Sequence, residues 1–177
     1  MEPESLVEAY ERGELADVRE LAPAVRYRVY LQIAARRLSL KLRPLLRALF
    51  ELELVYRLRD DDDLDDDGDH FENIYLCGAL LFDLGVVEDV ELLARAKFSR
   101  DMDLGTGFDI HCLFGAGVDE TLDYLSSLST DWAKEAHEYA RHCHAAGDLD
   151  NLADWRAGVS HYFSLEPRAG GRPDRPA

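Results

Sequence analysis

Apolar residues recur along the chain in a fixed register to four glycines. Counting from each glycine, apolar residues stand at plus five and plus eight, a separation that places each pair on one helical face. The units are Gly13 with Val18 and Leu21, Gly85 with Val90 and Leu93, Gly117 with Leu122 and Leu125, and Gly147 with Leu152 and Trp155. A glycine after an apolar-periodic segment usually closes a helix in the left-handed conformation. Each unit is therefore predicted to be an αα-hairpin.

The spacing of these glycines suits stacked helical repeats. Gly85, Gly117 and Gly147 follow one another at 32 and 30 residues, and Gly13 precedes Gly85 by 72 residues, close to two such periods. An irregular bundle whose helices happen to end in glycine fits the pattern equally well. The predicted fold is an all-α single domain of about nine helices, either repeat-like stacked αα-hairpins or an irregular helical bundle.

The rest of the hydrophobic pattern predicts where the helices lie. Pro23 suits the first turn of a helix, and Pro44 should interrupt the long pattern around it because proline lacks an amide proton. Between Lys97 and Gly107 the sequence has no apolar period and should form a loop. The predicted helices cover residues 5–12, 15–21, 24–41, 44–58, 70–84, 88–98, 107–115, 118–128, 131–146 and 149–162.

Three units also carry an apolar residue two positions after the glycine, namely Leu15, Val87 and Leu149. Glycine followed by apolar residues at plus two, five and eight resembles the inner turn of ankyrin repeats, as in GELADVREL at residues 13–21. The third unit departs with Asp119, and the TPLH turn of ankyrin is absent. The resemblance covers about a third of the chain and implies an ankyrin-like or HEAT-like scaffold of stacked αα-hairpins that binds proteins along one surface.

Composition limits the class of protein. The 177 residues are 47% apolar, enough for one domain with a substantial core. No apolar run approaches the ~20 residues that span a bilayer, and the acidic amino terminus does not fit a signal peptide. The domain is expected to cover residues 1–165, with a flexible tail rich in Pro, Gly and Arg at 166–177. Cys77, Cys112 and Cys143 are widely spaced and favour buried thiols in a cytoplasmic protein.

Charge is strongly segregated along the chain. Residues 19–59 carry ten Arg or Lys and three acidic residues, whereas residues 60–125 carry nineteen acidic and three basic residues. A field of one sign over a surface accelerates association with an oppositely charged partner. The overall charge of −16 argues against binding nucleic-acid phosphates. A simpler interpretation is that the basic helices pack beside the acidic ones and compensate their charge.

The run DDDDLDDDGD at residues 60–69 invites a calcium interpretation. An EF-hand with Gly68 at position six would place Asp63, Asp65 and Asp67 correctly at positions one, three and five. Position twelve, which requires a bidentate glutamate, is Ile74 instead. The run is therefore predicted to be a solvated acidic loop that presents charge to a partner, since its carboxylates repel one another.

Histidines gather in HEYARHCHAAG at residues 137–147. On a helix His137 and His144 lie two turns apart, too far for one zinc ion without a ligand from another helix, and HExxH is absent. His111, Cys112 or His161 would have to supply that ligand. Surface or boundary histidines are predicted here, with no metal or other cofactor. GxSxG, P-loop and GxGxxG motifs are absent too, so no catalytic residue is assigned.

These features predict a non-enzymatic protein-interaction module that binds a basic protein, most concretely a bacterial immunity or inhibitor-type protein. Two alternatives stay open. One is a metal-dependent enzyme that uses His137, His142 and His144, with His111 as a further candidate. The other is an oligomerising structural protein that pairs basic helices with the acidic half of another copy. The predicted partner-binding residues are Asp60, Asp61, Asp62, Asp63, Asp65, Asp66, Asp67 and Asp69, followed by Asp101 and Asp103.

Overall fold

The computed structural model describes residues 2–59 and 70–165; the Asp run and the tail lie outside these residues. The described residues contain nine α-helices, three short 3₁₀ helices and no strand, which confirms the prediction of an all-α single domain. The helices are α1 (Pro3–Glu11), α2 (Pro23–Ala34), η1 (Leu40–Leu42), α3 (Arg43–Arg57), α4 (Asn73–Leu84), η3 (Val87–Asp89), α5 (Val90–Lys97), α6 (Met102–Gly107), η4 (Ile110–Phe114), α7 (Val118–Ser127), α8 (Asp131–Ala146) and α9 (Leu152–Tyr162).

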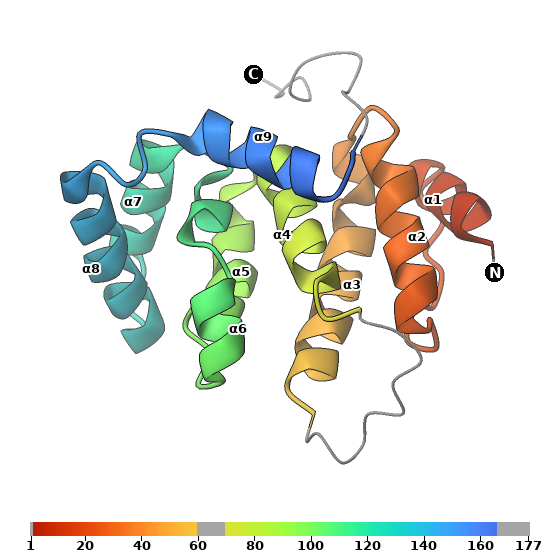
Figure 1. Ribbon diagram of the computed structural model, residues 1–177, viewed down its shortest axis with the longest axis horizontal. Helices are drawn as coiled ribbons and strands as arrows, with labels where there is room; N and C mark the ends of the chain where they lie inside the picture. Colours follow the sequence, from red (N-terminus) through yellow and green to blue (C-terminus); the bar gives the residue numbers. More distant parts are fainter. Residues whose placement is uncertain (1, 60–69, 166–177) are drawn as a thin grey trace.

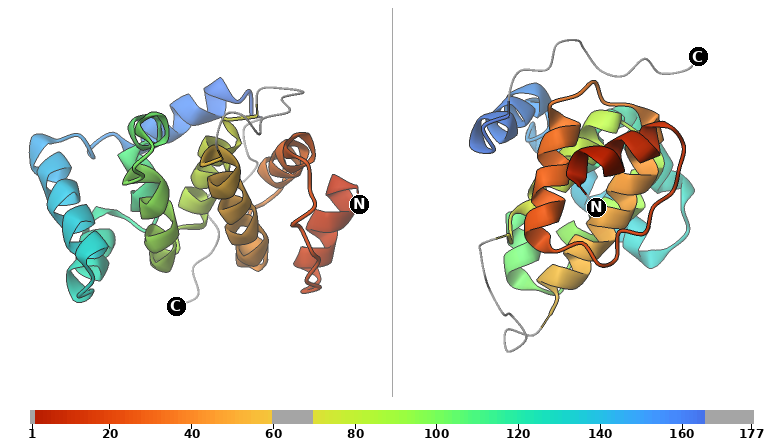
Figure 2. Two further views of the ribbon diagram at one scale, coloured as in Figure 1. Left: turned by 90° about the horizontal axis from the view of Figure 1, so that it is seen from below. Right: turned by 90° about the vertical axis from the view of Figure 1, so that its right-hand side faces the viewer.

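Most helices stand side by side along the longest axis of the molecule (Figure 1). Helices α1 and α2 lie at one end and α7 and α8 at the other, while α9 crosses the upper ends of the helices between them. The same order is seen from below in Figure 2. Sequential helices pack as pairs, α1 on α2, α3 on α4 and α7 on α8. Whether these pairs form a regular ankyrin-like or HEAT-like repeat stays a prediction.

The four register glycines all adopt positive φ, between 65° and 117°. Gly85 and Gly147 are the left-handed caps that end α4 and α8, as predicted. Gly13 follows the end of α1, whereas Gly117 precedes α7 and closes no α-helix. The eight apolar residues counted from these glycines are all in the core or packed against it. The register therefore identified core positions correctly.

Prolines mark two helix starts correctly. Pro23 lies in the first turn of α2 and Pro44 in the first turn of α3, so the long apolar pattern between them is divided as predicted. A proline in the first turn costs no helical hydrogen bond because the amides there have no partner within the helix. No described helix has both the length and the apolar character that a bilayer crossing needs.

The helix predicted at residues 15–21 is wrong. The segment is irregular between α1 and α2. Its backbone is fixed by side chains: the Tyr10 hydroxyl donates to the Ala16 carbonyl at 2.9 Å, and Asp17 accepts the Arg19 amide at 3.0 Å. Such local side-chain bonds compete with the helical ladder. Only one helix of the first predicted hairpin therefore forms before α2.

The loop predicted between Lys97 and Gly107 is also wrong, because it contains α6. Asp101 caps this short helix by accepting the amide of Leu104 at 2.7 Å. Lys97 donates to the carbonyl of Gly105 at 3.1 Å, which ties α6 to α5. An aspartate at the N-cap is a standard helix-start signal. Because the segment has no apolar period, the sequence pattern did not predict helix α6.

Three further helices are shorter than predicted. The segment 24–41 ends early as α2, the segment 107–115 contains only the last residue of α6 and then η4, and the segment 149–162 begins later as α9. Ser39 and Asp109 cap the 3₁₀ helices η1 and η4, since each accepts a backbone amide two residues ahead, at 3.3 and 3.1 Å. Both residues start a 3₁₀ helix and so separate it from the preceding segment.

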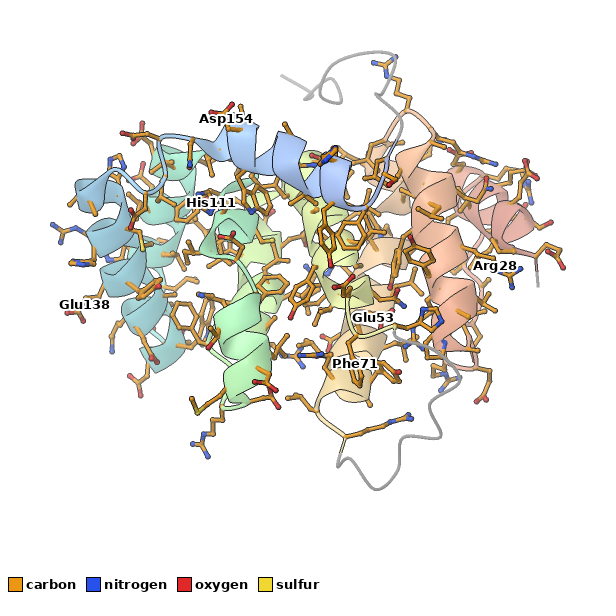
Figure 3. All side chains as sticks on the ribbon, viewed as in Figure 1. Arg28, Glu53, Phe71, His111, Glu138 and Asp154 are labelled. Carbon is orange, nitrogen blue, oxygen red and sulfur yellow. The ribbon has the colours of Figure 1, made fainter. Side chains whose placement is uncertain are left out.

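A buried ionic network joins α2, α3 and α4. Glu53, whose side chain is 1% exposed, accepts two bonds from the Arg26 guanidinium at 2.7 and 3.0 Å. The same carboxylate accepts from the Tyr30 hydroxyl at 2.7 Å and from the Asn73 amide at 3.3 Å. Arg26 donates further to the carbonyl of Leu21 at 2.7 Å. Figure 3 labels Glu53 among these helices. The charge is thus paired where water is excluded.

Candidate functional site

Several basic side chains of α2 and α3, and of the segment between them, pair with carboxylates of the same chain. Arg43 and Arg47 both bond the buried carboxylate of Asp89, which holds the start of α5 against α3. Arg36, next to the end of α2, lies within 4 Å of three carboxylates of α1, those of Glu4, Glu8 and Glu11. Arg43 and Arg47 thus pair with the acidic half of the chain, as the simpler interpretation proposed. Arg26 and Arg36 instead pair with carboxylates outside that half.

Carboxylates of α6, α7 and α8 are arranged differently. Many are exposed, and within the described ranges they form no ion pair with a Lys or Arg; these are Asp103, Asp119, Asp123, Glu135 and Glu138. Glu138 points away from the outer side of α8 (Figure 3). Because the carboxylates of α6, α7 and α8 outnumber the two Lys or Arg side chains of these helices, Lys134 and Arg141, the field over this surface is negative.

Asp101 and Asp103 lie at the start of α6, close to the first turn of α4. The two carboxylates act electrostatically on Tyr75: burial raises the pKa of its hydroxyl, Arg57 lowers it, and Glu72, Asp103 and Asp101 raise it further. Asp103 is exposed, whereas Asp101 is partly buried and occupied as the α6 cap. Asp103 is consequently the better placed of the two for contact with a partner.

The Asp run itself lies outside the described residues, but the helices on either side of it are described. The end of α3 and the start of α6 both lie at the lower edge of the molecule in Figure 1. The predicted second-choice residues of α6 are therefore on the same edge as the helix that leads into the run.

The histidines of α8 are spread over its surface. His142 and His144 are exposed, His137 is partly exposed, and Cys143 between them is buried against the core. His111 lies elsewhere, beneath α9 (Figure 3). Among the residues that the structure describes, no three His, Cys, Asp or Glu side chains are grouped so that they could hold a metal ion.

A pocket of about 500 Å³ lies beneath α9. One wall comes from the start of α4, another from the segment that joins α6 to η4, and the third from α9 itself. Aromatic side chains form much of its lining, and two lining residues carry carboxylates, Glu72 and Asp109. The aromatic side chains that line it are Tyr75, Trp155, Tyr162 and Phe163. Sequence reasoning missed this pocket entirely.

Helix α9, which covers the pocket, has no buried residue and is held by polar clamps. Arg156 forms a two-pronged ion pair with Asp83 of α4, at 2.7 and 2.6 Å, and donates to Ser160 at 2.7 Å. A planar guanidinium matched to both oxygens of a carboxylate fixes direction as well as distance. The clamp sets how α9 lies over α4.

His111 is the second clamp of α9. Its Nδ1 lies 2.5 Å from Asp109 Oδ1, and its Nε2 lies 2.9 Å from the carbonyl of Asp148 and 3.0 Å from Asn151 Oδ1. The ring stacks on Trp155 at 5.5 Å. Burial lowers the pKa of His111, but these acceptors outweigh burial and raise it above its ordinary 6.5. Both ring nitrogens face acceptors, so the site favours the imidazolium form.

Replacing His111 by glutamine should cost stability in a pH-dependent way. The raised pKa means that the ionic contribution is complete below pH 6.5 and is lost as pH rises through the folded-state value. The difference in unfolding free energy between wild type and His111→Gln is expected to be largest in mildly acidic solution and to shrink toward alkaline pH. Denaturant titrations over a pH series measure it, with exposed His142→Gln as the control. A difference that grows with pH contradicts the assignment.

Comparison with protein-family models, with curated proteins and with solved structures gives no match to this chain. Function must therefore be argued from the residues described above.

Proposed function

We propose that the chain is a non-enzymatic protein-binding module whose acidic surface binds a basic protein. In its most concrete form it is a bacterial inhibitor of the immunity-protein type, which neutralises a basic toxin or nuclease. The observation that carries the proposal is an asymmetry of charge pairing: Arg26, Arg43 and Arg47 of α2 and α3 pair with buried carboxylates. In contrast, five exposed carboxylates of α6 to α8 form no ion pair in the described part of the chain, namely Asp103, Asp119, Asp123, Glu135 and Glu138.

This asymmetry supports binding because unpaired surface charge acts at a distance. A net charge of −16 on 177 residues gives a negative field that attracts a basic protein and orients it before contact. Salt should weaken the attraction, because exposed charges are screened beyond a Debye length of about 8 Å at physiological ionic strength. Asp60, Asp61, Asp62, Asp63, Asp65, Asp66, Asp67, Asp69, Asp101 and Asp103 are the proposed contact residues.

The oligomer alternative draws less support from the same contacts. It needs free basic helices that can pair with the acidic half of a second copy. Arg26, Arg36, Arg43 and Arg47 already pair with carboxylates of their own chain. The three cysteines are buried as free thiols, which fits the cytoplasmic setting that we propose.

Neutralising the Asp run should weaken partner binding at least about tenfold at low salt, because steering and ion pairing depend on these charges. The variant replaces Asp60–Asp63 by asparagine. The measurement is affinity capture from native lysate at low and high salt, with quantitative mass spectrometry, followed by titration of the captured protein against wild type and variant.

The matched control removes the same number of charges from α7 and α8. It replaces the carboxylates of Asp119, Asp123, Glu135 and Glu138 by their amides; these charges add to the general field but are not proposed contacts, so affinity should fall by less than for the Asp60–Asp63 variant, by about threefold. The proposal is lost if both variants bind the captured protein as wild type does, or if the affinity does not depend on salt.

A further inference from the structure

We infer that the pocket beneath α9 receives an arginine side chain of the basic partner. The inference rests on the proposed function for the partner's identity, and it deepens that proposal by naming the side chain that is recognised. It is carried by the chemistry of the pocket: aromatic walls, two carboxylates and a volume of about 500 Å³.

The walls of the pocket suit a flat cation. Trp155, Tyr75, Tyr162 and Phe163 contribute aromatic faces and edges to it. A guanidinium group stacks on such faces through cation–π attraction and is hydrated more weakly than an ammonium group. Aromatic rings alone would also take a neutral ligand. The preference for a positively or negatively charged ligand must therefore come from the polar groups that line the pocket.

Those polar groups are acidic. Glu72 contributes a carboxylate from the residue before α4, and Asp109 contributes another from the residue before η4. No Lys, Arg or His is among the described residues that line the pocket. Two cations beside the pocket are already paired: Arg156 with Asp83, and His111 with Asp109. Glu72 is therefore the carboxylate that a cationic ligand would pair with. A positively charged ligand would complete this arrangement.

Glu72 also links the pocket to the proposed contact surface. It follows the Asp run closely in the chain, and its carboxylate and those of Asp101 and Asp103 act on the same Tyr75 hydroxyl. The Tyr162 hydroxyl donates to Glu72 and so holds this carboxylate against α9. A basic protein that is attracted by Asp101 and Asp103 would thus meet the pocket near the first turn of α4, which carries Tyr75.

Gly158 leaves the pocket open. It lies on α9 among the lining residues, and a Cβ added there would meet no atom within 4 Å. Because Gly158 lines the pocket and the space at its Cβ position is open, a leucine there should occupy the pocket. The Gly158→Leu variant should therefore block the pocket and melt no lower than wild type.

The test uses two small probes with the full-length protein. Nα-acetylarginine amide carries the cation, and Nα-acetylcitrulline amide has nearly the same shape without charge. Titrations followed by ¹H–¹⁵N NMR, with the Trp155 indole signal as the reporter, should give a saturable shift and at least about tenfold tighter binding of the arginine probe. Glu72→Gln should weaken that binding several-fold, and Gly158→Leu should abolish it.

Equal binding of the two probes, or undiminished binding by a folded Gly158→Leu protein, overturns the arginine pocket. If that happens while the Asp60–Asp63 variant still loses a basic partner, the proposed function stands without the pocket. If the probes bind as expected while the Asp60–Asp63 variant binds normally, the pocket stands and the proposed acidic surface is lost.

Discussion

Replacing Glu53 by alanine is expected to destabilise the protein by about 3–5 kcal/mol, the usual consequence of removing one partner of a buried ion pair. The variant leaves the Arg26 guanidinium without its carboxylate and takes away the acceptor of the Tyr30 hydroxyl. Both groups are buried and cannot regain water. Equilibrium denaturation with urea, monitored by circular dichroism, measures the loss.

A matched control lies on the same helix. Glu51 pairs with Arg95 at 2.5 Å, but both side chains are about half exposed, and Glu51→Ala should cost only about 0–1 kcal/mol. Replacing the buried pair together, with Arg26→Met and Glu53→Leu, should recover much of the lost stability because no charge is then stranded. Equal costs at Glu51 and Glu53 would show that the network is not shielded from water.

Local sequence signals predicted much of this fold. Glycines with apolar residues in fixed register identified turns and core positions, since the left-handed conformation and helical spacing depend only on neighbours in the chain. The same approach failed at residues 15–21 and at α6. There Asp17 and Asp101 bond nearby amides and decide the backbone conformation, although neither contributes to an apolar period.

The candidate site was much less accessible to such reasoning. The charge pattern left open whether the basic helices pair within the chain or with another copy. In the structure Arg43 and Arg47 pair with Asp89, more than forty residues further along the chain. The pocket needs Glu72, Asp109 and Trp155 together, and no periodic pattern relates positions so far apart. Composition gives only the number of charged residues. How α3, α4 and α9 pack determines which of these charges form ion pairs.

Replacing Gly115 by alanine should be the most damaging single-methyl change that the described chain offers. Gly115 follows η4 where it crosses α4, and a Cβ would lie 2.3 Å from the carbonyl oxygen and 2.8 Å from the Cα of Phe82. These are backbone atoms of a buried helix, so no side chain can rotate away. Overpacking of this kind costs about 1–3 kcal/mol, and sometimes more.

The same substitution at Gly158 should have the opposite sign. A Cβ on this α9 residue meets nothing within 4 Å, and alanine there should stabilise the helix by about 0.5–1 kcal/mol because it reduces the freedom of the unfolded chain. Thermal unfolding of both variants beside wild type measures the contrast; for a chain of this length about 2–4 °C corresponds to each kcal/mol. If Gly115→Ala has the same melting temperature as wild type, then η4 does not approach α4 as closely as these contacts require. The position of η4 in the lining of the pocket beneath α9 would then be wrong as well.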